Sequence, residues 1–177
     1  MSPQRSAPCC DRGPIGVRAS SQHGAERWGD ILVYTSAPLE ADIDLIGDVT
    51  VSLHAASTAV DTDFTAKLCR VDPDGESVNL KQGIVRARFR ESRSAPSPIE
   101  PGRVYEYRID LGPLGARIPA GYRLRLDVSS SDFPHWDSNL NTGGALGREG
   151  PEAAVVATQT VLHDRLRPSR ITLPVAP

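Results

Sequence analysis

This sequence lacks a catalytic nucleophile in a recognisable setting. Hydrolases built on an α/β scaffold place their serine in a Gly-x-Ser-x-Gly motif, because small residues let the backbone turn sharply beneath the side chain. Residues 75–79 supply the first glycine and Ser77 but end in Asn79 instead of the second glycine. They also follow a predicted hairpin turn, so Ser77 is interpreted as a turn residue. Nucleophile, base and oxyanion hole must be assembled together, and we therefore expect no hydrolytic activity from this chain alone.

Residues of the types that can bind metal ions are dispersed along the chain. The four histidines, at positions 23, 54, 135 and 163, lack the pairwise spacing of a zinc site. The acidic residues in 61–63 and 72–74 are similar to fragments of a calcium loop. The further ligands and the distal glutamate of an EF-hand are missing, however. We expect no metal ion and no cofactor, with a structural calcium ion left as an alternative.

The densest group of residues that could bind a ligand is the segment 129–144. Phe133 and Trp136 stand there among short hydrogen-bonding side chains, including Asp132, Asn139 and Asn141. This mixture suits a sugar site, in which a sugar ring stacks on an aromatic side chain. It equally suits an ordered loop whose aromatic residues cap a core while Asp and Asn side chains bond the loop's own backbone. We favour the ordered loop and expect Phe133 and Trp136 to be largely buried.

The elements that must position this segment are β-strands. Apolar and polar residues alternate over short runs between turn signals, a pattern typical of an antiparallel sandwich. Residues 72–75 predict a tight turn, residues 113–121 an irregular connection, and the second half of 149–163 a strand. About eight strands are expected, which predicts an all-β jelly-roll sandwich. The alternating runs are 49–55, 64–69, 85–90, 105–111, 122–128 and 171–175.

Three arginines follow one face of the run 85–90. Arg86, Arg88 and Arg90 alternate with apolar residues, so a strand would place all three on the same side. The simpler interpretation is a face in contact with solvent. The alternative is a face that meets acidic groups of another domain, where bidentate pairing would fix the orientation.

Composition limits the classes of partner and compartment. A chain of 177 residues can bury one core without disulfides, and its formal net charge of -2 gives no field that would collect nucleic acid or a membrane surface. Three cysteines, an odd number, favour a reducing compartment, so we expect a cytoplasmic protein. Residues 1–30 are polar and aperiodic, which predicts a flexible tail or extended lead-in before one domain at 31–177.

Four segments of the sequence carry a family resemblance. They are 32–39, 60–68, 83–92 and 129–144, the last of which ends in Asn-Leu-Asn-Thr-Gly-Gly. In this order and spacing they resemble the C-terminal domain of the X-prolyl dipeptidyl peptidase and cocaine esterase family, which includes acyl and amino-acid ester hydrolases. The resemblance covers the chain from about residue 13 to its end. It implies a jelly roll of the galactose-binding-like type, in agreement with the alternating strands.

The resemblance also implies a role and a partner. In that family a Ser-Asp-His triad lies in a preceding α/β-hydrolase domain, and the jelly roll packs against it and helps to close the substrate pocket. It implies a noncatalytic domain whose partner is a catalytic α/β-hydrolase domain, missing here or on a separate chain, of an enzyme that hydrolyses peptide or ester bonds. A homo-oligomer and a free-standing carbohydrate-binding module are left as alternatives. The candidate interface or binding residues are Asp61, Asp63, Arg86, Arg88, Asp132, Phe133, Trp136, Asn139 and Asn141.

Overall fold

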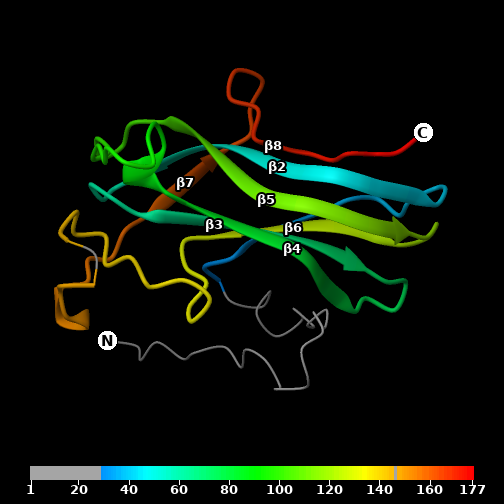
Figure 1. Ribbon diagram of the computed structural model, residues 1–177, viewed down its shortest axis with the longest axis horizontal. Coiled ribbons are helices and arrows are strands. Elements are labelled where there is room, and N and C mark those ends of the chain that lie inside the picture. Colours follow the sequence, from blue (N-terminus) through cyan, green and yellow to red (C-terminus); the bar gives the residue numbers. More distant parts are fainter. Residues whose placement is uncertain (1–28, 146) are drawn as a thin grey trace.

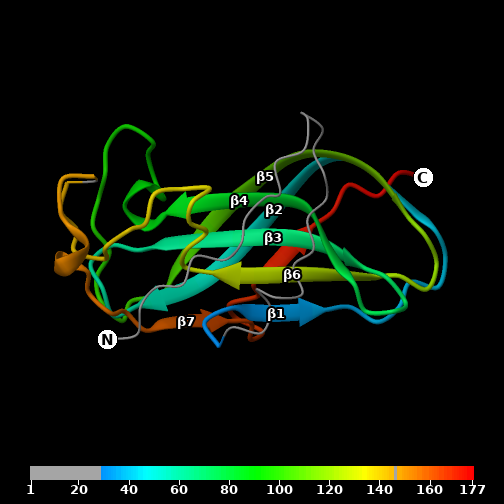
Figure 2. The ribbon, with the colours of Figure 1, turned by 90° about the horizontal axis from the view of Figure 1, so that it is seen from below.

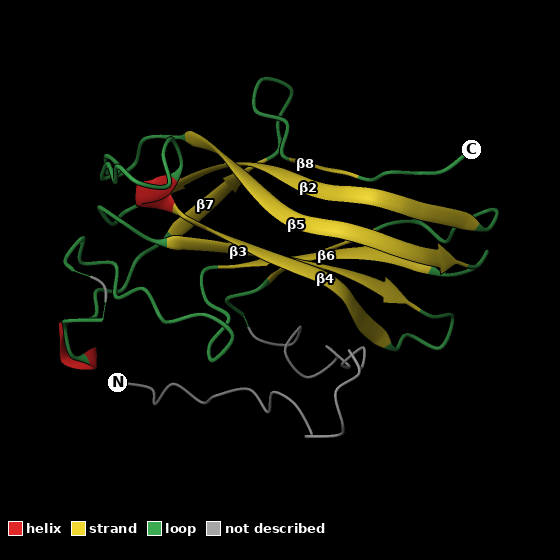
Figure 3. Ribbon diagram, viewed as in Figure 1, coloured by secondary structure: helices red, strands yellow, loops and turns green. Residues whose placement is uncertain are grey.

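The computed structural model describes residues 29–145 and 147–177. Eight strands among these residues form two antiparallel sheets that face each other (Figure 1). Sheet A has the order β1-β6-β3-β4, and sheet B has the order β5-β2-β7 with β8 also paired to β2. The predicted all-β sandwich is confirmed. The strands, drawn in yellow in Figure 3, are β1 (Leu32–Thr35), β2 (Ile43–Ser57), β3 (Asp63–Val71), β4 (Ser77–Arg86), β5 (Tyr105–Ile118), β6 (Arg123–Ser129), β7 (Gln159–Leu162) and β8 (Arg170–Thr172).

The core lies between the two sheets because strand alternation sends every second side chain inward. Val49, Val51 and Leu53 of β2 are buried, as their alternation with polar neighbours predicts. The ring of Phe64 on β3 packs against Tyr107 on β5, with centroids 4.8 Å apart. These contacts join sheet A to sheet B across the middle of the molecule.

Two local predictions are confirmed and one is wrong. In the turn at 72–75, the N–H of Gly75 donates to the carbonyl oxygen of Asp72 at 3.0 Å. The second half of 149–163 forms β7, after a single 3-10 turn at Pro151–Ala153. The run 85–90, in contrast, is not one strand, because β4 ends at Arg86 and a 3-10 turn follows at Ala87–Phe89.

The predicted irregular connection at 113–121 is wrong for residues 113–118, because β5 continues to Ile118. Pro113 is tolerated there since β5 is an edge strand, where the missing N–H is not needed by a second neighbour. Gly112 has a φ of 77° beside a break in register at Val49 and Thr50. Gly112 therefore adopts the left-handed conformation at this shift in register, and β5 continues past Pro113.

The two long sides of the sandwich differ. On one side β4 and β5 approach so closely that a Cβ atom at Gly83 would lie 2.3 Å from the backbone oxygen of Asp110, so only glycine fits. On the other side, β1 of sheet A runs beside β7 of sheet B along the lower edge of Figure 2. The rings of Tyr34 and His163 meet there with centroids 6.1 Å apart.

The predicted tail at 1–30 lies outside the described residues except for Gly29 and Asp30, and so do Cys9 and Cys10. Of the cysteines, only Cys69 of β3 can be described, and it is a buried thiol. Its Sγ lies 3.8 Å from a carboxylate oxygen of Asp127.

Candidate functional site

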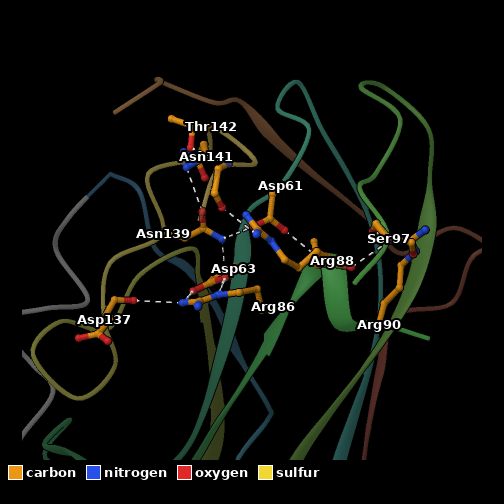
Figure 4. A network of polar contacts seen from close by, with 12 residues as sticks. Asp61, Asp63, Arg86, Arg88, Arg90, Ser97, Asp137, Asn139, Asn141 and Thr142 are labelled. Carbon is orange, nitrogen blue, oxygen red and sulfur yellow. Dashed lines mark hydrogen bonds and ion pairs between the residues drawn. The ribbon is translucent and has the colours of Figure 1, made fainter. Parts of the chain in front are cut away.

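Asp63, a buried residue at the start of β3, forms a bidentate ion pair with Arg86 at the end of β4 (Figure 4). The Nε atom of Arg86 donates to Oδ1 at 2.8 Å, and a terminal nitrogen donates to Oδ2 at 2.9 Å. The two residues are direct partners in the register of β3 and β4. The hydrogen bonds that Arg86 donates to Asp63 raise the pKa of Arg86 above its ordinary value.

Asp61, two residues before Asp63, forms a second ion pair with Arg88, two residues after Arg86. The Nε atom of Arg88 donates to Oδ2 of Asp61 at 2.7 Å, and the backbone N–H of Arg88 donates to Oδ1 at 2.9 Å. The second bond gives the backbone at Arg88 a partner outside the sheet. It explains why the chain leaves β4 after Arg86 and turns at Ala87–Phe89.

Asn139 connects the two ion pairs. Its amide nitrogen donates to Oδ2 of Asp61 at 2.9 Å and to Oδ1 of Asp63 at 2.8 Å. Its amide oxygen accepts the backbone N–H of Asn141 at 2.9 Å. Asp61, Asp63, Arg86, Arg88 and Asn139 thus form one network, which we call the polar cluster.

The polar cluster fixes the long segment between β6 and β7. A terminal nitrogen of Arg88 donates to the carbonyl oxygen of Gly144 at 2.8 Å. Asn141 has a φ of 64° and donates its side-chain N–H to the carbonyl oxygen of Val155 at 2.9 Å. Segment 137–145 is therefore tied at both ends by side chains instead of by a strand ladder.

Both carboxylates of the polar cluster, those of Asp61 and Asp63, are paired with guanidinium groups and accept hydrogen bonds from the amide of Asn139. Among residues 29–145 and 147–177, no three His, Cys, Asp or Glu side chains lie close enough to hold a metal ion. In the same part of the chain, no helix has the length and apolar character to cross a membrane.

The interpretation of Arg86, Arg88 and Arg90 as one face is wrong. Arg86 and Arg88 bond acidic groups of this domain, Asp63 and Asp61, and do not form a face in contact with solvent. Arg90 lies 4.4 Å above the ring of Tyr105 and donates to the carbonyl oxygens of Ala87 and Ser97. The two aspartates of 61–63 share the spacing of Arg86 and Arg88, and this matched spacing is the signal that could have predicted the pairing.

The first part of segment 129–144 forms an exposed tip. The carbonyl oxygen of Asp132 accepts the N–H groups of His135 and Trp136 at 2.8 and 3.2 Å, and its carboxylate pairs with Lys67 of β3 at 2.6 Å. Phe133 is 54% exposed and Trp136 is half-buried against the edge of His135. The expectation that both aromatic residues are largely buried is wrong for Phe133, because the tip projects beyond β6 and does not lie between the sheets.

Similarity to known proteins places this geometry in a family. The family model for the X-Pro dipeptidyl-peptidase C-terminal non-catalytic domain matches residues 5–172. The chain belongs to this family. It is 42% identical over 165 residues to cocaine esterase of Rhodococcus sp. strain MB1, a match that covers 93% of this chain and 28% of the esterase.

Solved structures of two enzymes agree with the fold. An aminopeptidase from a marine sediment Thaumarchaeota archaeon superposes with a TM-score of 0.86 at 28% identity, covering 90% of this chain and 28% of the aminopeptidase. An α-amino acid ester hydrolase superposes with a TM-score of 0.83 at 28% identity, covering 89% of this chain and 27% of the hydrolase. The chain therefore spans less than a third of the length of these relatives, and it is their noncatalytic C-terminal type of domain.

Proposed function

We propose that this domain docks on the catalytic α/β-hydrolase part of an enzyme that cleaves ester or peptide bonds, and that the aromatic tip at 132–136 is part of the docking surface. The names of the relatives support the chemistry, since they include an esterase, an ester hydrolase and an aminopeptidase. The share of their length outside the match, about seven-tenths, supports a further domain.

The observation that carries the proposal is the exposure of Phe133 on a segment that is held firmly from below. A large aromatic side chain in water costs free energy, and a pre-organised aromatic residue is a common anchor of an interface. Asp132 fixes the near side of the tip through Lys67, and Asn139 fixes the far side through Asp61 and Asp63. Little conformational entropy is then lost when a partner covers Phe133.

Two finer assignments belong to this proposal. The eight described strands in two antiparallel sheets support a jelly roll of the galactose-binding-like type. The buried thiol of Cys69 and the odd number of cysteines support a cytoplasmic location.

A chimeric enzyme tests the docking. The segment of Rhodococcus cocaine esterase that matches this chain is replaced by the full 177-residue chain. We expect the chimera to hydrolyse p-nitrophenyl esters, and we expect Phe133→Asp to lower its thermal midpoint and its activity. The matched control is Leu166→Asp, which alters an exposed apolar residue on a different loop. A Phe133→Asp chimera that behaves like the Leu166→Asp chimera would contradict the proposal.

The same variants test the two alternatives in the isolated chain. A carbohydrate-binding module would bind glycans on an array and would lose that binding on Phe133→Asp. Sedimentation velocity of the wild-type chain tests for a homo-oligomer. Purified chain incubated with p-nitrophenyl esters and X-Pro anilides should give no turnover.

A further inference from the structure

The outer face of sheet A contains buried side chains that the two described layers do not account for. Strand β3 sends Leu68 into the core, so alternation turns Cys69 and Val71 outward, away from sheet B. Cys69 is nevertheless 0% exposed and Val71 is 2% exposed, and neither belongs to the core cluster between the sheets. Ser77 of β4, the register partner of Val71, is also 0% exposed. Outward residues on two neighbouring strands are therefore hidden from solvent.

The outer face of sheet B shows how an uncovered face differs from this one. Its central strand β2 turns Thr50, Ser52 and His54 outward, and all three are partly exposed. Strand β3 has the equivalent position in sheet A, with a neighbour on each side. Figure 2 shows sheet A from its outer side, and no described strand lies in front of β3. The cover over Cys69 and Val71 must therefore come from outside the described residues.

The covered face also contains buried polar atoms without a partner. The hydroxyl of Ser77 and the amide oxygen of Asn79 make no hydrogen bond among the described residues. Both side chains lie on the outer side, because Ser77 pairs with Val71 and Asn79 pairs with Cys69 in the register of β3 and β4. A buried polar atom that lacks a hydrogen bond costs free energy. The cover should therefore supply hydrogen-bonding groups as well as apolar surface.

We propose that residues 13–28 of this chain lie across the outer face of sheet A and form a third layer over β3 and β4. The run 15–19, Ile-Gly-Val-Arg-Ala, alternates apolar residues with Gly16 and Arg18. An extended chain would place its three apolar side chains on one side, against Cys69 and Val71. Its main-chain N–H groups would be available to the polar atoms of β4.

Similarity to known proteins supports this segment as part of the domain. The family model matches from residue 5. The match to cocaine esterase covers 165 of the 177 residues, so it begins no later than residue 13. The part of the chain before β1 is thus similar to the relatives along with the strands.

The segment also has the reach that the proposal requires. In the order β1-β6-β3-β4, strand β3 lies two strand spacings from β1, which is roughly 10 Å. The chain from residue 19 to residue 29 can span up to about 33 Å when extended. The inference does not depend on the docking proposal, because the cover and the face belong to one chain. It closes the outer face of sheet A to other partners.

Thiol accessibility in the full chain tests the inference. Replacing Cys9 and Cys10 by serine leaves Cys69 as the single thiol, and mass spectrometry follows its alkylation by iodoacetamide. We expect Cys69 to react at least about 100-fold more slowly in the native chain than in urea. Val17→Asp places a charge on the covering side and should accelerate the native reaction at least about tenfold. The matched control is Arg18→Asp, which alters the opposite side of the run and should leave the rate unchanged.

Disulfide formation tests the contact directly. Single cysteines are introduced into the same serine-substituted chain, and peptide mapping follows mild oxidation. We expect at least one of them to form an intramolecular disulfide with Cys69, because a disulfide requires Cα atoms within about 7 Å. The covering side is represented by Ile15→Cys, Val17→Cys and Ala19→Cys. The controls, which should not form this disulfide, are Gly16→Cys and Arg18→Cys.

The two measurements give results that would overturn the inference. Cys69 that reacts as fast in the native chain as in urea would show an open face. Equal native rates for the parent and Val17→Asp, with no intramolecular disulfide, would mean that residues 13–28 are not the cover. Disulfides that join two chains would identify a second copy as the cover. Circular dichroism and thermal unfolding show whether each variant has folded, and if Val17→Asp does not fold, the disulfides decide alone.

Discussion

The segment between β6 and β7 joins two regions of opposite character. At its base, Asn139 lies among two buried aspartates, and each of its polar groups has a partner. At its tip, Phe133 is more exposed than buried. The base has the properties of a folded interior, whereas the tip has those of a binding surface. Under the docking proposal, one loop separates a stabilising base from a binding tip, and substitutions in the two regions should have different consequences.

The largest effect on stability should come from the base. Asp61→Ala removes the acceptor of Arg88 and of Asn139 and leaves a guanidinium group largely buried without its counter-ion. Breaking such a pair costs about 3–5 kcal/mol of the free energy of unfolding. Urea denaturation of the isolated chain measures this cost. Asp42→Ala, which removes an exposed partner of Arg117, is the control and should shift the midpoint little. Equal effects of the two variants would remove the distinction between base and surface.

A polar group near the base that has no partner should respond to pH. The hydroxyl of Tyr107 is buried and makes no hydrogen bond among the described residues, and burial raises its pKa from 10.0 to about 12. The unfolded chain therefore loses this proton at a lower pH than the folded chain. The contribution of Tyr107 to the free energy of unfolding is fully present below pH 10 and is lost as the pH rises toward 12. The total loss should be about 3 kcal/mol.

The variant Tyr107→Phe isolates that effect. It removes the titrating group and leaves no unpaired partner behind, so its stability below pH 10 should equal or exceed that of the wild type. Urea denaturation at a series of alkaline pH values compares the two proteins. If the slope above pH 10 is the same in both, another group causes the alkaline loss.

A smaller effect is expected for the residue that joins the base to the loop. Asn139→Ala removes hydrogen bonds to two carboxylates but keeps both ion pairs, so it should cost about 2 kcal/mol. It should also release segment 137–145, which limited proteolysis of the folded chain would detect. Unchanged resistance to protease would mean that the Arg88 bond to Gly144 is sufficient to hold the segment.

The smallest effects on stability belong to the tip. Trp136 is half-buried, so Trp136→Ala should cost about 1 kcal/mol, and Phe133→Ala should change stability by less than about 0.5 kcal/mol. Thermal unfolding of the isolated chain gives this order. In the chimeric enzyme the order should reverse, with Phe133→Ala the more damaging. A Phe133→Ala domain that unfolds as readily as Asp61→Ala would show that the tip is part of the core.

The sequence predicts β2 well because both of its faces have a simple environment. Val49, Val51 and Leu53 meet the core, and the residues between them do not. Pro113 was misleading, since tolerance of proline depends on whether a strand lies at an edge, and that is a property of the sheet order. Phe133 was misleading for a related reason: residue type indicates that a side chain prefers burial but does not indicate which molecule buries it.

The polar cluster is a second feature that the local sequence pattern did not predict. The alternation of apolar and charged residues places Arg86 and Arg88 on the same face of a strand only if the strand continues through both residues. Asp61 accepts the backbone N–H of Arg88 and ends the strand, although Asp61 is distant in sequence. Short-range patterns therefore predict the strands, and long-range hydrogen bonds decide where they stop.

The position of β2 at the centre of sheet B has a consequence for the order of folding. It pairs with β5 on one side, and on the other side with β7 and β8, where Thr50 lies opposite Thr172. Contacts between residues so far apart in sequence form slowly. During synthesis, one edge of β2 must stay unpaired until almost the whole sequence has been translated, and such edges invite aggregation. Sheet B therefore cannot be completed before residues 159–172 have been translated.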